Sequence, residues 1–345
     1  MPVFLHRRLL DWYDAHRREM PWRDHPDPYA VWVSEIMLQQ TQVETVRGYF
    51  ARFMAAFPTL AALAAAPQQE VLKAWEGLGY YTRARNLQKA AQALIARGGK
   101  LPQGTVEWAA LPGVGPYTAA AISSICFGVY APVVDGNVIR VFARFLGWPD
   151  DFRKPPARLR LAAWLQPHIE ASKRPGDFNQ AMMDLGATLC VPRAPACAVC
   201  PLKRLCVARR EGRQDALPYK PAKRNVPTRV GVAVLVRDRM GRVLFTQRTE
   251  EGLLSGLWEL PNVTIERTPT AGDALRVLSQ QAGLTAKRAS CHGMVTHVFS
   301  HFKLQLHIFE VPVFNGTLDL ERKPPVRFAN PEELPLTTAT RRALA

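Results

Sequence analysis

Residues 111–122 read Leu-Pro-Gly-Val-Gly-Pro-Tyr-Thr-Ala-Ala-Ala-Ile. Gly113 and Gly115 permit a tight turn whose backbone N–H groups are not shielded by side chains. A helix is expected to start at once, at Pro116, so its free N–H groups and its dipole favour an anion at the same place. Such an arrangement grips a phosphate without reading base sequence, although a plain connector between two helices is the simpler explanation.

The charge of the chain supports a polyanionic partner. The 345 residues carry a formal net charge of +16, and residues 1–228 account for +12 of it. Binding to phosphates releases counterions, whereas a merely soluble basic surface is the plainer explanation. No apolar run reaches the roughly 20 residues needed to cross a bilayer, and residues 1–8 lack a secretory pattern. We therefore expect a cytoplasmic protein with no membrane partner.

The length favours two or three domains, and the patterning changes along the chain. Helical spacing predicts an all-α module over residues 1–212, with one helix opening at Asp27 and the next at the capping-box pattern Thr41-Gln-Val-Glu44. Three prolines, scattered charge and no apolar period predict a linker over 213–228. Alternating apolar residues and one helical stretch then predict a small α+β domain over 229–345.

Four of the six cysteines lie within 17 residues, with the spacing C-x6-C-x2-C-x5-C. Disulfides are not expected inside a reducing cell, whereas clustered thiolates suit a soft metal centre. On spacing alone, zinc and a [4Fe–4S] cluster both remain open. The four cysteines are Cys190, Cys197, Cys200 and Cys206.

Two further segments complete a resemblance to a known family. Residues 28–43 read PYAVWVSEIMLQQTQV, and residues 133–138 read VVDGNV. Together with the hairpin and the cysteine spacing, they resemble the MutY-type adenine DNA glycosylases of the helix–hairpin–helix, endonuclease III-like superfamily, over about residues 1–312. The resemblance implies a helix–hairpin–helix glycosylase module, a [4Fe–4S] cluster on the four cysteines in place of zinc, and a C-terminal α+β Nudix-like domain.

The resemblance also assigns catalytic roles. Glu35 lies beside the apolar stripe of its helix, and a carboxyl in an apolar cleft has its neutral form favoured. It would be the general acid that protonates adenine. Asp135 lies where a helix begins, so a plain N-cap would explain it; an ionised carboxylate there would also stabilise the charge developing on the sugar. Tyr117 replaces the Schiff-base lysine of the bifunctional members, and it would support Asp135 together with Asn137.

Other positions are implied to contact DNA or the extruded base. Ordinary packing would equally explain the aromatic residues among them. The implied roles are an adenine pocket for Trp22 and Arg23, a gap-filling interhelical corner for Leu38, Gln39, Gln40 and Thr41, a wedge for Tyr80, and a phosphate grip for Gly113, Val114 and Gly115.

The C-terminal domain is expected to read a lesion rather than to hydrolyse a nucleotide. A true Nudix box places glutamates on magnesium, but the alignment puts Val277, Gln280 and Gln281 at those positions. By the same resemblance, a loop that recognises 8-oxoguanine is formed by Phe299, Ser300 and His301. A strand end with a packed phenylalanine and a surface histidine is the plainer alternative.

The sequence therefore predicts a monomeric base-excision repair glycosylase. It would hydrolyse the N-glycosidic bond of adenine opposite 8-oxoguanine or guanine in double-stranded DNA and leave an abasic site. One alternative is a bifunctional glycosylase/lyase for oxidised pyrimidines, against which Tyr117 argues. The other is a non-catalytic DNA-binding protein, against which Glu35 and Asp135 argue.

Overall fold

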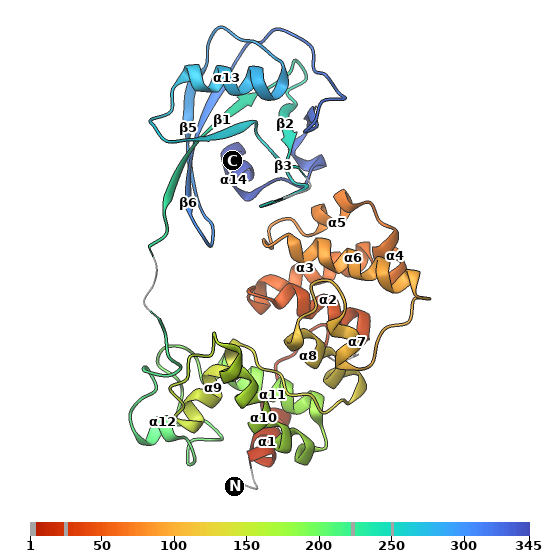
Figure 1. The fold of residues 1–345 in the computed structure, drawn as a ribbon, viewed down its shortest axis with the longest axis vertical. Helices are drawn as coiled ribbons and strands as arrows, with labels where there is room; N and C mark the ends of the chain where they lie inside the picture. Colours follow the sequence, from red (N-terminus) through yellow and green to blue (C-terminus); the bar gives the residue numbers. More distant parts are fainter. Residues whose placement is uncertain (1–4, 24–26, 222–224, 250–251) are drawn as a thin grey trace. The chain divides into compact units, whose positions relative to one another are not determined.

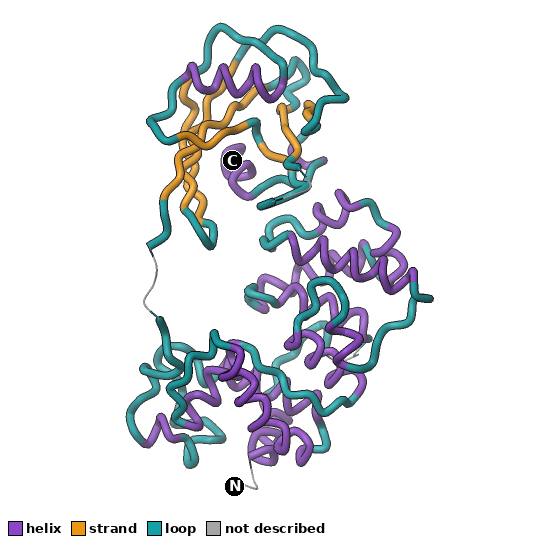
Figure 2. Tube along the Cα trace, viewed as in Figure 1, coloured by secondary structure: helices purple, strands orange, loops and turns teal. Residues whose placement is uncertain are grey.

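The computed structural model describes residues 5–23, 27–221, 225–249 and 252–345. The chain divides into two compact units, one formed by 1–64 and 89–222, and the other by 65–88 and 223–345. The first unit is helical, and the second contains the β-sheets (Figure 1, Figure 2). Within the described ranges, no helix is long and apolar enough to span a membrane.

The core of the helical unit combines the N-terminal helix with three consecutive helices from near the end of the unit. Leu9, Phe142, Leu161 and Phe178 come from different helices, and all four side chains are fully buried in one core. The helices that contribute to this unit are α1 (Leu5–His16), α2 (Pro28–Leu38), α3 (Val43–Ala56), α4 (Leu60–Ala65), α6 (Thr82–Ala96, which begins in the other unit), α7 (Thr105–Ala109), α8 (Pro116–Phe127), α9 (Gly136–Leu146), α10 (Pro155–Ser172), α11 (Pro175–Thr188) and α12 (Val207–Arg210).

The starts of the helices follow from their capping residues, with one correction. Asp27 caps α2, as predicted, because its carboxylate accepts the backbone N–H of Tyr29 at 3.1 Å. The capping box predicted at Thr41 is wrong: α3 begins at Val43, and its N-cap residue Gln42 makes no side-chain cap. The Thr41 hydroxyl donates to the main-chain oxygen of Gln39 at 3.5 Å.

The hairpin has the predicted form. Gly113 adopts φ 76°, a conformation that favours glycine, and Gly115 is the N-cap of α8. Leu111 and Val114 are buried and anchor the turn, which the Val114 N–H closes by donating to the Leu111 oxygen at 3.2 Å. The free N–H groups at the start of α8 therefore follow directly after a tight turn.

The second unit contains two sheets with strand orders β4-β1-β6-β5 and β3-β2-β7. Strand β1 is buried on both faces, because Val232 and Val234 pack beneath α13 while Ala233 and Leu235 join the core formed with α14. The elements are β1 (Thr228–Val236), β2 (Val243–Gln247), β3 (Trp258–Glu259), β4 (Asn262–Ile265), α13 (Ala271–Ala282), β5 (Ser290–Val298), β6 (Lys303–Val311), β7 (Val326–Ala329), the short 3-10 helix Pro331–Glu333 and α14 (Thr338–Leu344).

Residues 65–88, which include α5 (Gln68–Ala74), belong to the same unit as these sheets. The indole N–H of Trp258 donates to the Gln69 side chain at 3.0 Å, and Arg341 pairs with Glu76 at 2.5 Å. These partly buried contacts join an early segment of the chain to the sheet-containing part of the same unit.

The domain bounds 1–212, 213–228 and 229–345 stay a prediction. Of the expected linker, residues 222–224 lie outside the described residues. Its first part packs on the helical unit, where Leu217 is buried and its main-chain oxygen accepts from Arg144 at 3.0 Å.

Candidate active site

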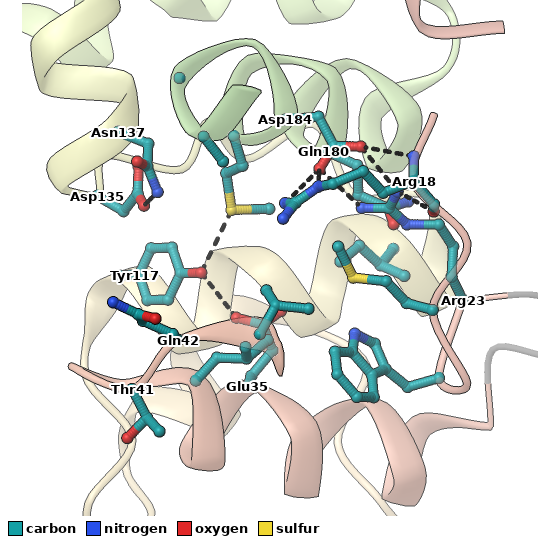
Figure 3. A pocket seen from close by; sticks show the side chains of 18 of the residues that line it. Arg18, Arg23, Glu35, Thr41, Gln42, Tyr117, Asp135, Asn137, Gln180 and Asp184 are labelled. Atoms are coloured by element: carbon teal, nitrogen blue, oxygen red, sulfur yellow. Dashed lines mark hydrogen bonds and ion pairs between the residues drawn. The ribbon is translucent and has the colours of Figure 1, made fainter. Parts of the chain in front are cut away.

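A cavity of about 480 Å³ lies in the helical unit. Side chains from the segment before α2, from α2 itself, and from α8, α9 and α11 converge on it (Figure 3). Eight of the residues singled out in the sequence line this one cavity: Trp22, Arg23, Glu35, Leu38, Thr41, Tyr117, Asp135 and Asn137.

Glu35 is held in the cavity as a buried carboxyl. Glu35 is only 5% exposed, and its Oε2 accepts a hydrogen bond of 2.7 Å from the Tyr117 hydroxyl. The pKa of Glu35 is raised from 4.5 to about 7, chiefly by burial and in smaller part by the charge of Asp135, whereas the Tyr117 hydrogen bond and Arg23 oppose the rise. Near neutral pH this group can therefore act as a proton donor.

Asp135 is oriented by two hydrogen bonds. Oδ1 accepts the backbone N–H of Val138 at 2.7 Å, which makes Asp135 the N-cap of α9, and Oδ2 accepts the Asn137 amide at 2.9 Å. Helix α11 approaches closely here: a Cβ atom added to Gly186 would lie 2.6 Å from that of Asn137. Glycine at 186 therefore permits the packing that completes this side of the cavity.

Arg140 connects this carboxylate to the cysteine segment. Its Nη2 donates to Oδ1 of Asn137 at 2.7 Å and to the Gly186 oxygen at 2.8 Å, while Nε donates to the main-chain oxygen of Cys190 at 2.7 Å. The orientation of Asn137, and through it that of Asp135, thus depends on a side chain one helical turn further along α9.

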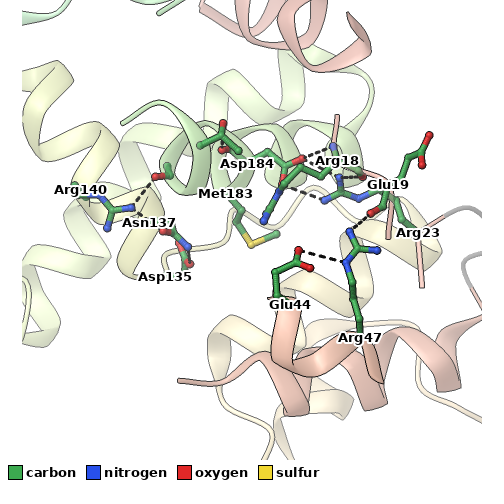
Figure 4. A network of polar contacts seen from close by, with 12 residues as sticks. Arg18, Glu19, Arg23, Glu44, Arg47, Asp135, Asn137, Arg140, Met183 and Asp184 are labelled. Atoms are coloured by element: carbon green, nitrogen blue, oxygen red, sulfur yellow. Dashed lines mark hydrogen bonds and ion pairs between the residues drawn. The ribbon is translucent and has the colours of Figure 1, made fainter. Parts of the chain in front are cut away.

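Sequence reasoning missed a buried ionic cluster at the other end of the cavity. Asp184 on α11 is fully buried and accepts hydrogen bonds from the guanidinium groups of Arg18 and Arg23 at 2.6–3.3 Å (Figure 4). The carboxylate bonds to both guanidinium groups at the edge of the cavity, so Arg23 is held in a fixed position. No local motif reveals a pair separated by 166 residues in sequence.

Other expected contact residues do not line the cavity. The Gln39 amide donates to the Thr118 hydroxyl at 3.1 Å, and Gln40 is exposed with φ 60°. Both belong to the corner between α2 and α3, next to Leu38 and Thr41, which do reach the cavity. The hairpin residues Gly113, Val114 and Gly115 likewise lie outside the set that lines it.

The expected reader loop and wedge belong to the second unit. The N–H of Phe299 donates to the Phe302 oxygen at 2.8 Å, and the two rings stack at 4.6 Å. This closed turn leaves Ser300 and His301 exposed. Tyr80 is 47% exposed, has φ 49°, and brings its hydroxyl within 3.3 Å of Ser300 Oγ.

The four clustered cysteines line a second, small cavity of about 30 Å³. The buried Arg144 contributes to the same lining and donates to Cys190 Sγ at 3.4 Å. In the described part of the chain, no three His, Cys, Asp or Glu side chains are spaced to hold a single metal ion. Four thiols around one cavity form a donor set that suits a soft metal centre, as in zinc sites and iron–sulfur clusters.

Two protein families match parts of the chain. The model of the HhH-GPD superfamily base excision DNA repair protein matches residues 33–167, and the NUDIX domain model matches residues 232–345. Adenine DNA glycosylase of Rattus norvegicus is 38% identical, with 95% of this chain and 74% of the relative covered. The chain belongs to the adenine DNA glycosylase family. A further adenine DNA glycosylase, from Buchnera aphidicola, is 32% identical, with 87% of this chain and 84% of the relative covered.

Solved structures are similar to the helical unit of this adenine DNA glycosylase family member. A thermostable thymine-DNA glycosylase is 28% identical, covers 60% of this chain and has a TM-score of 0.53. Endonuclease III trapped in a covalent complex with DNA is 26% identical, covers 61% of this chain and has a TM-score of 0.52. The predicted fold class, a helix–hairpin–helix glycosylase module followed by a Nudix-like α+β domain, is confirmed.

The Nudix-like domain of this family member lacks carboxylates at the expected magnesium positions. Val277 is buried in the core beneath β1, and the Gln281 side chain bonds to the backbone of Asn262 at 2.6 and 3.1 Å. The carboxylate of the nearby Asp273 pairs with Arg267 and Arg276 and also takes part in the capping box at the start of α13. None of these side chains offers the free oxygen ligands that a nucleotide-hydrolysing domain needs.

Proposed function

We propose that this protein hydrolyses the N-glycosidic bond of adenine in double-stranded DNA and leaves an abasic site. The observation that supports it most strongly is a buried carboxyl with a pKa of about 7, Glu35, in the same cavity as the ionisable Asp135. One neutral and one ionised carboxyl are the pair that glycoside cleavage requires. Membership of the adenine DNA glycosylase family supports adenine as the leaving base.

In the proposed reaction, an extruded adenine enters the cavity between Trp22, Arg23 and Glu35. Glu35 donates its proton to the base, which turns adenine into a better leaving group. Asp135, oriented by Asn137 and the start of α9, stabilises the positive charge that develops on the sugar as the bond breaks. Water then completes the hydrolysis.

The reaction is proposed to stop at the abasic site. A lyase needs an amine that forms a Schiff base with the sugar, and position 117 carries a phenol instead. Burial raises the pKa of Tyr117 well above its usual value, so it stays a neutral hydrogen-bond donor rather than a nucleophile. Strand breaks are therefore expected only after alkali.

We propose that the opposite base is 8-oxoguanine or guanine. The support comes from the closed turn that exposes Ser300 and His301, with Tyr80 beside it. Exposed polar groups at a rigid turn suit hydrogen bonding to a base edge. The test compares adenine release opposite 8-oxoguanine and opposite guanine in S300A; a lost preference at unchanged maximal rate supports the assignment, and an unchanged preference contradicts it.

The four thiols are proposed to hold a [4Fe–4S] cluster. When bound, it supplies a structural brace for residues 190–206 and no step of the hydrolysis. Iron content and visible absorbance test this in C200S, with C126S as the matched control, because Cys126 lies outside the cysteine cavity.

We propose that the enzyme is monomeric and that its partner is duplex DNA. The exposed basic residues around the cysteine segment, the hairpin and the net positive charge support duplex DNA as the partner.

The deciding experiment uses a duplex with a single A·8-oxoguanine pair. We expect the wild type to produce an alkali-dependent break at the adenine, and E35Q to produce none. E170Q is the matched control, because Glu170 is exposed on α10 and its carboxylate accepts a hydrogen bond from the Gln166 amide. Breaks without alkali would favour the lyase alternative, and tight binding without any release would favour a non-catalytic protein.

A further inference from the structure

The Tyr117 hydroxyl has two acceptors. It lies 2.7 Å from Oε2 of Glu35 and 3.3 Å from the sulfur of Met183 on α11 (Figure 3). A thioether sulfur can only accept a hydrogen bond, and a phenol has one proton to give. The carboxyl and the sulfur therefore compete for the same proton.

This competition affects the acid, because a hydrogen bond from Tyr117 stabilises the ionised form of Glu35. Any share of the phenol proton that goes to sulfur weakens that stabilisation and favours the form that can protonate a base. Met183 is partly buried and packs against the core formed by α1, α9, α10 and α11, so its sulfur is held in place. The neighbouring Asp184, paired with Arg18 and Arg23, anchors the same turn of α11.

We propose that Met183 is a positioning residue that shares the Tyr117 hydroxyl proton with Glu35 and so keeps the acid from being held in its ionised form. The inference rests on the proposed function, in which Glu35 is the general acid, and extends it to a residue of the cavity wall that acts through Tyr117. A leucine would fill the same space without an acceptor.

Substitution of Met183 leaves every charged group of the cavity in place. The charged groups that line the cavity together with Glu35 are Arg18, Arg23, Glu44, Asp135, Arg140 and Asp184. A changed titration of Glu35 in a Met183 variant would therefore report the hydrogen-bond competition rather than a lost charge.

The test is an infrared titration of the full-length protein, which needs no catalysis. The carbonyl stretch of protonated Glu35 is the band that disappears in E35Q. In M183L we expect the pKa of that band to fall by about half a unit, because Tyr117 then donates to Glu35 alone. In M183Q, whose amide oxygen is a stronger acceptor, we expect it to rise.

The pH dependence of adenine release under single-turnover conditions gives a second readout. M183L should lose about threefold in rate above the pKa of Glu35 and almost nothing well below it. In a Y117F background, which has no proton to share, M183L should cause no further shift.

The outcomes separate the two proposals. An unshifted infrared band in both Met183 variants, the same shift in the Y117F background, or a rate loss that is equal at every pH overturns the role of Met183. A wild type that releases no adenine while the infrared shifts occur overturns the proposed function and leaves the proton competition standing.

Discussion

Oδ2 of Asp135 accepts a hydrogen bond of 2.9 Å from the side-chain amide of Asn137. Because Oδ1 simultaneously caps α9 through the Val138 N–H, the carboxylate is fixed by two independent contacts. A fixed negative charge stabilises a developing cation without reorganising during the reaction. The geometry thus provides one stationary charge, while Glu35 provides the movable proton.

Loss of that charge should stop the chemistry while preserving the fold. D135N keeps an oxygen for the Val138 N–H, so we expect a stability loss below about 1 kcal/mol in chemical denaturation. Single-turnover adenine release should fall by roughly 10²- to 10³-fold, because the charge on the sugar loses its counterpart. Binding of the mismatched duplex, measured by fluorescence anisotropy, should persist. A variant that releases adenine at the wild-type rate would remove Asp135 from the mechanism.

Adenine release should depend on one protonated group. With the pKa of Glu35 at about 7, the single-turnover rate should be flat at low pH and fall about tenfold per pH unit above 7. The rate is measured from pH 5.5 to 9 at saturating enzyme. A rate that rises with pH across this range would mean that position 35 acts as a base.

The same proton should be visible in stability. A carboxyl whose pKa is higher in the folded state than in the unfolded state stabilises the fold below the unfolded value, and that stabilisation is lost as pH rises through the folded value. For Glu35 this window runs from 4.5 to about 7. At pH 8, E35Q should therefore have a free energy of unfolding about 3 kcal/mol above the wild type. A variant no more stable at pH 8 than at pH 5, relative to wild type, would contradict the burial effect.

The Asp184 cluster should contribute more to stability than a surface pair of the same chemistry. D184N leaves two arginines without their buried partner and should cost about 3 kcal/mol. The control D14N removes an exposed pair with Arg174, and it should cost less than about 1 kcal/mol. Chemical denaturation measures both. Equal losses would mean that the cavity cluster is as solvated as the surface pair.

Arg144 should hold the cysteine segment together. The residue is 1% exposed, and its guanidinium donates to the main-chain oxygens of Gln214, Leu217, Val191 and Pro192. R144K cannot reproduce the planar fork, so several buried carbonyls lose their donor at about 1 kcal/mol or more each. We expect a lower melting temperature and lower iron content per chain.

The control for this variant is R210K, because Arg210 is 73% exposed in its ion pair with Glu211. Its melting temperature and iron content should match those of the wild type. If R144K also behaved as wild type, the hydrogen bonds of Arg144 would not contribute to retention of the cysteine segment.

Local patterns predicted most of the fold. Asp27 and Asp135 cap helices as expected, and strands with one longer helix follow in the C-terminal region. The capping-box prediction at Thr41 was wrong because α3 begins at Val43, so that Gln42 rather than Thr41 is its N-cap residue. The residue at which a helix begins depends on the geometry of the preceding loop, which the four-residue pattern at 41–44 does not determine.

The cavity was predicted less completely than the fold. Glu35 and Asp135 were singled out from their sequence motifs, and both line the same cavity. Arg18, Asp184 and Met183 were missed because each acts through a partner far away in the chain. Only the packing of α11 against α8 and against the segment between α1 and α2 reveals those contacts.

The contact of residues 65–88 with the sheet-containing unit has a consequence for building chimaeras. A gene fragment cut after the prolines that follow α12 would encode Trp258 and Arg341 but not Gln69 and Glu76, to which they bond. If the C-terminal part were transplanted into another enzyme, the indole of Trp258 and the guanidinium of Arg341 would therefore lose the hydrogen-bond partners that they have in the native chain. The exchangeable piece is two stretches of polypeptide, separated by more than a hundred residues of another module.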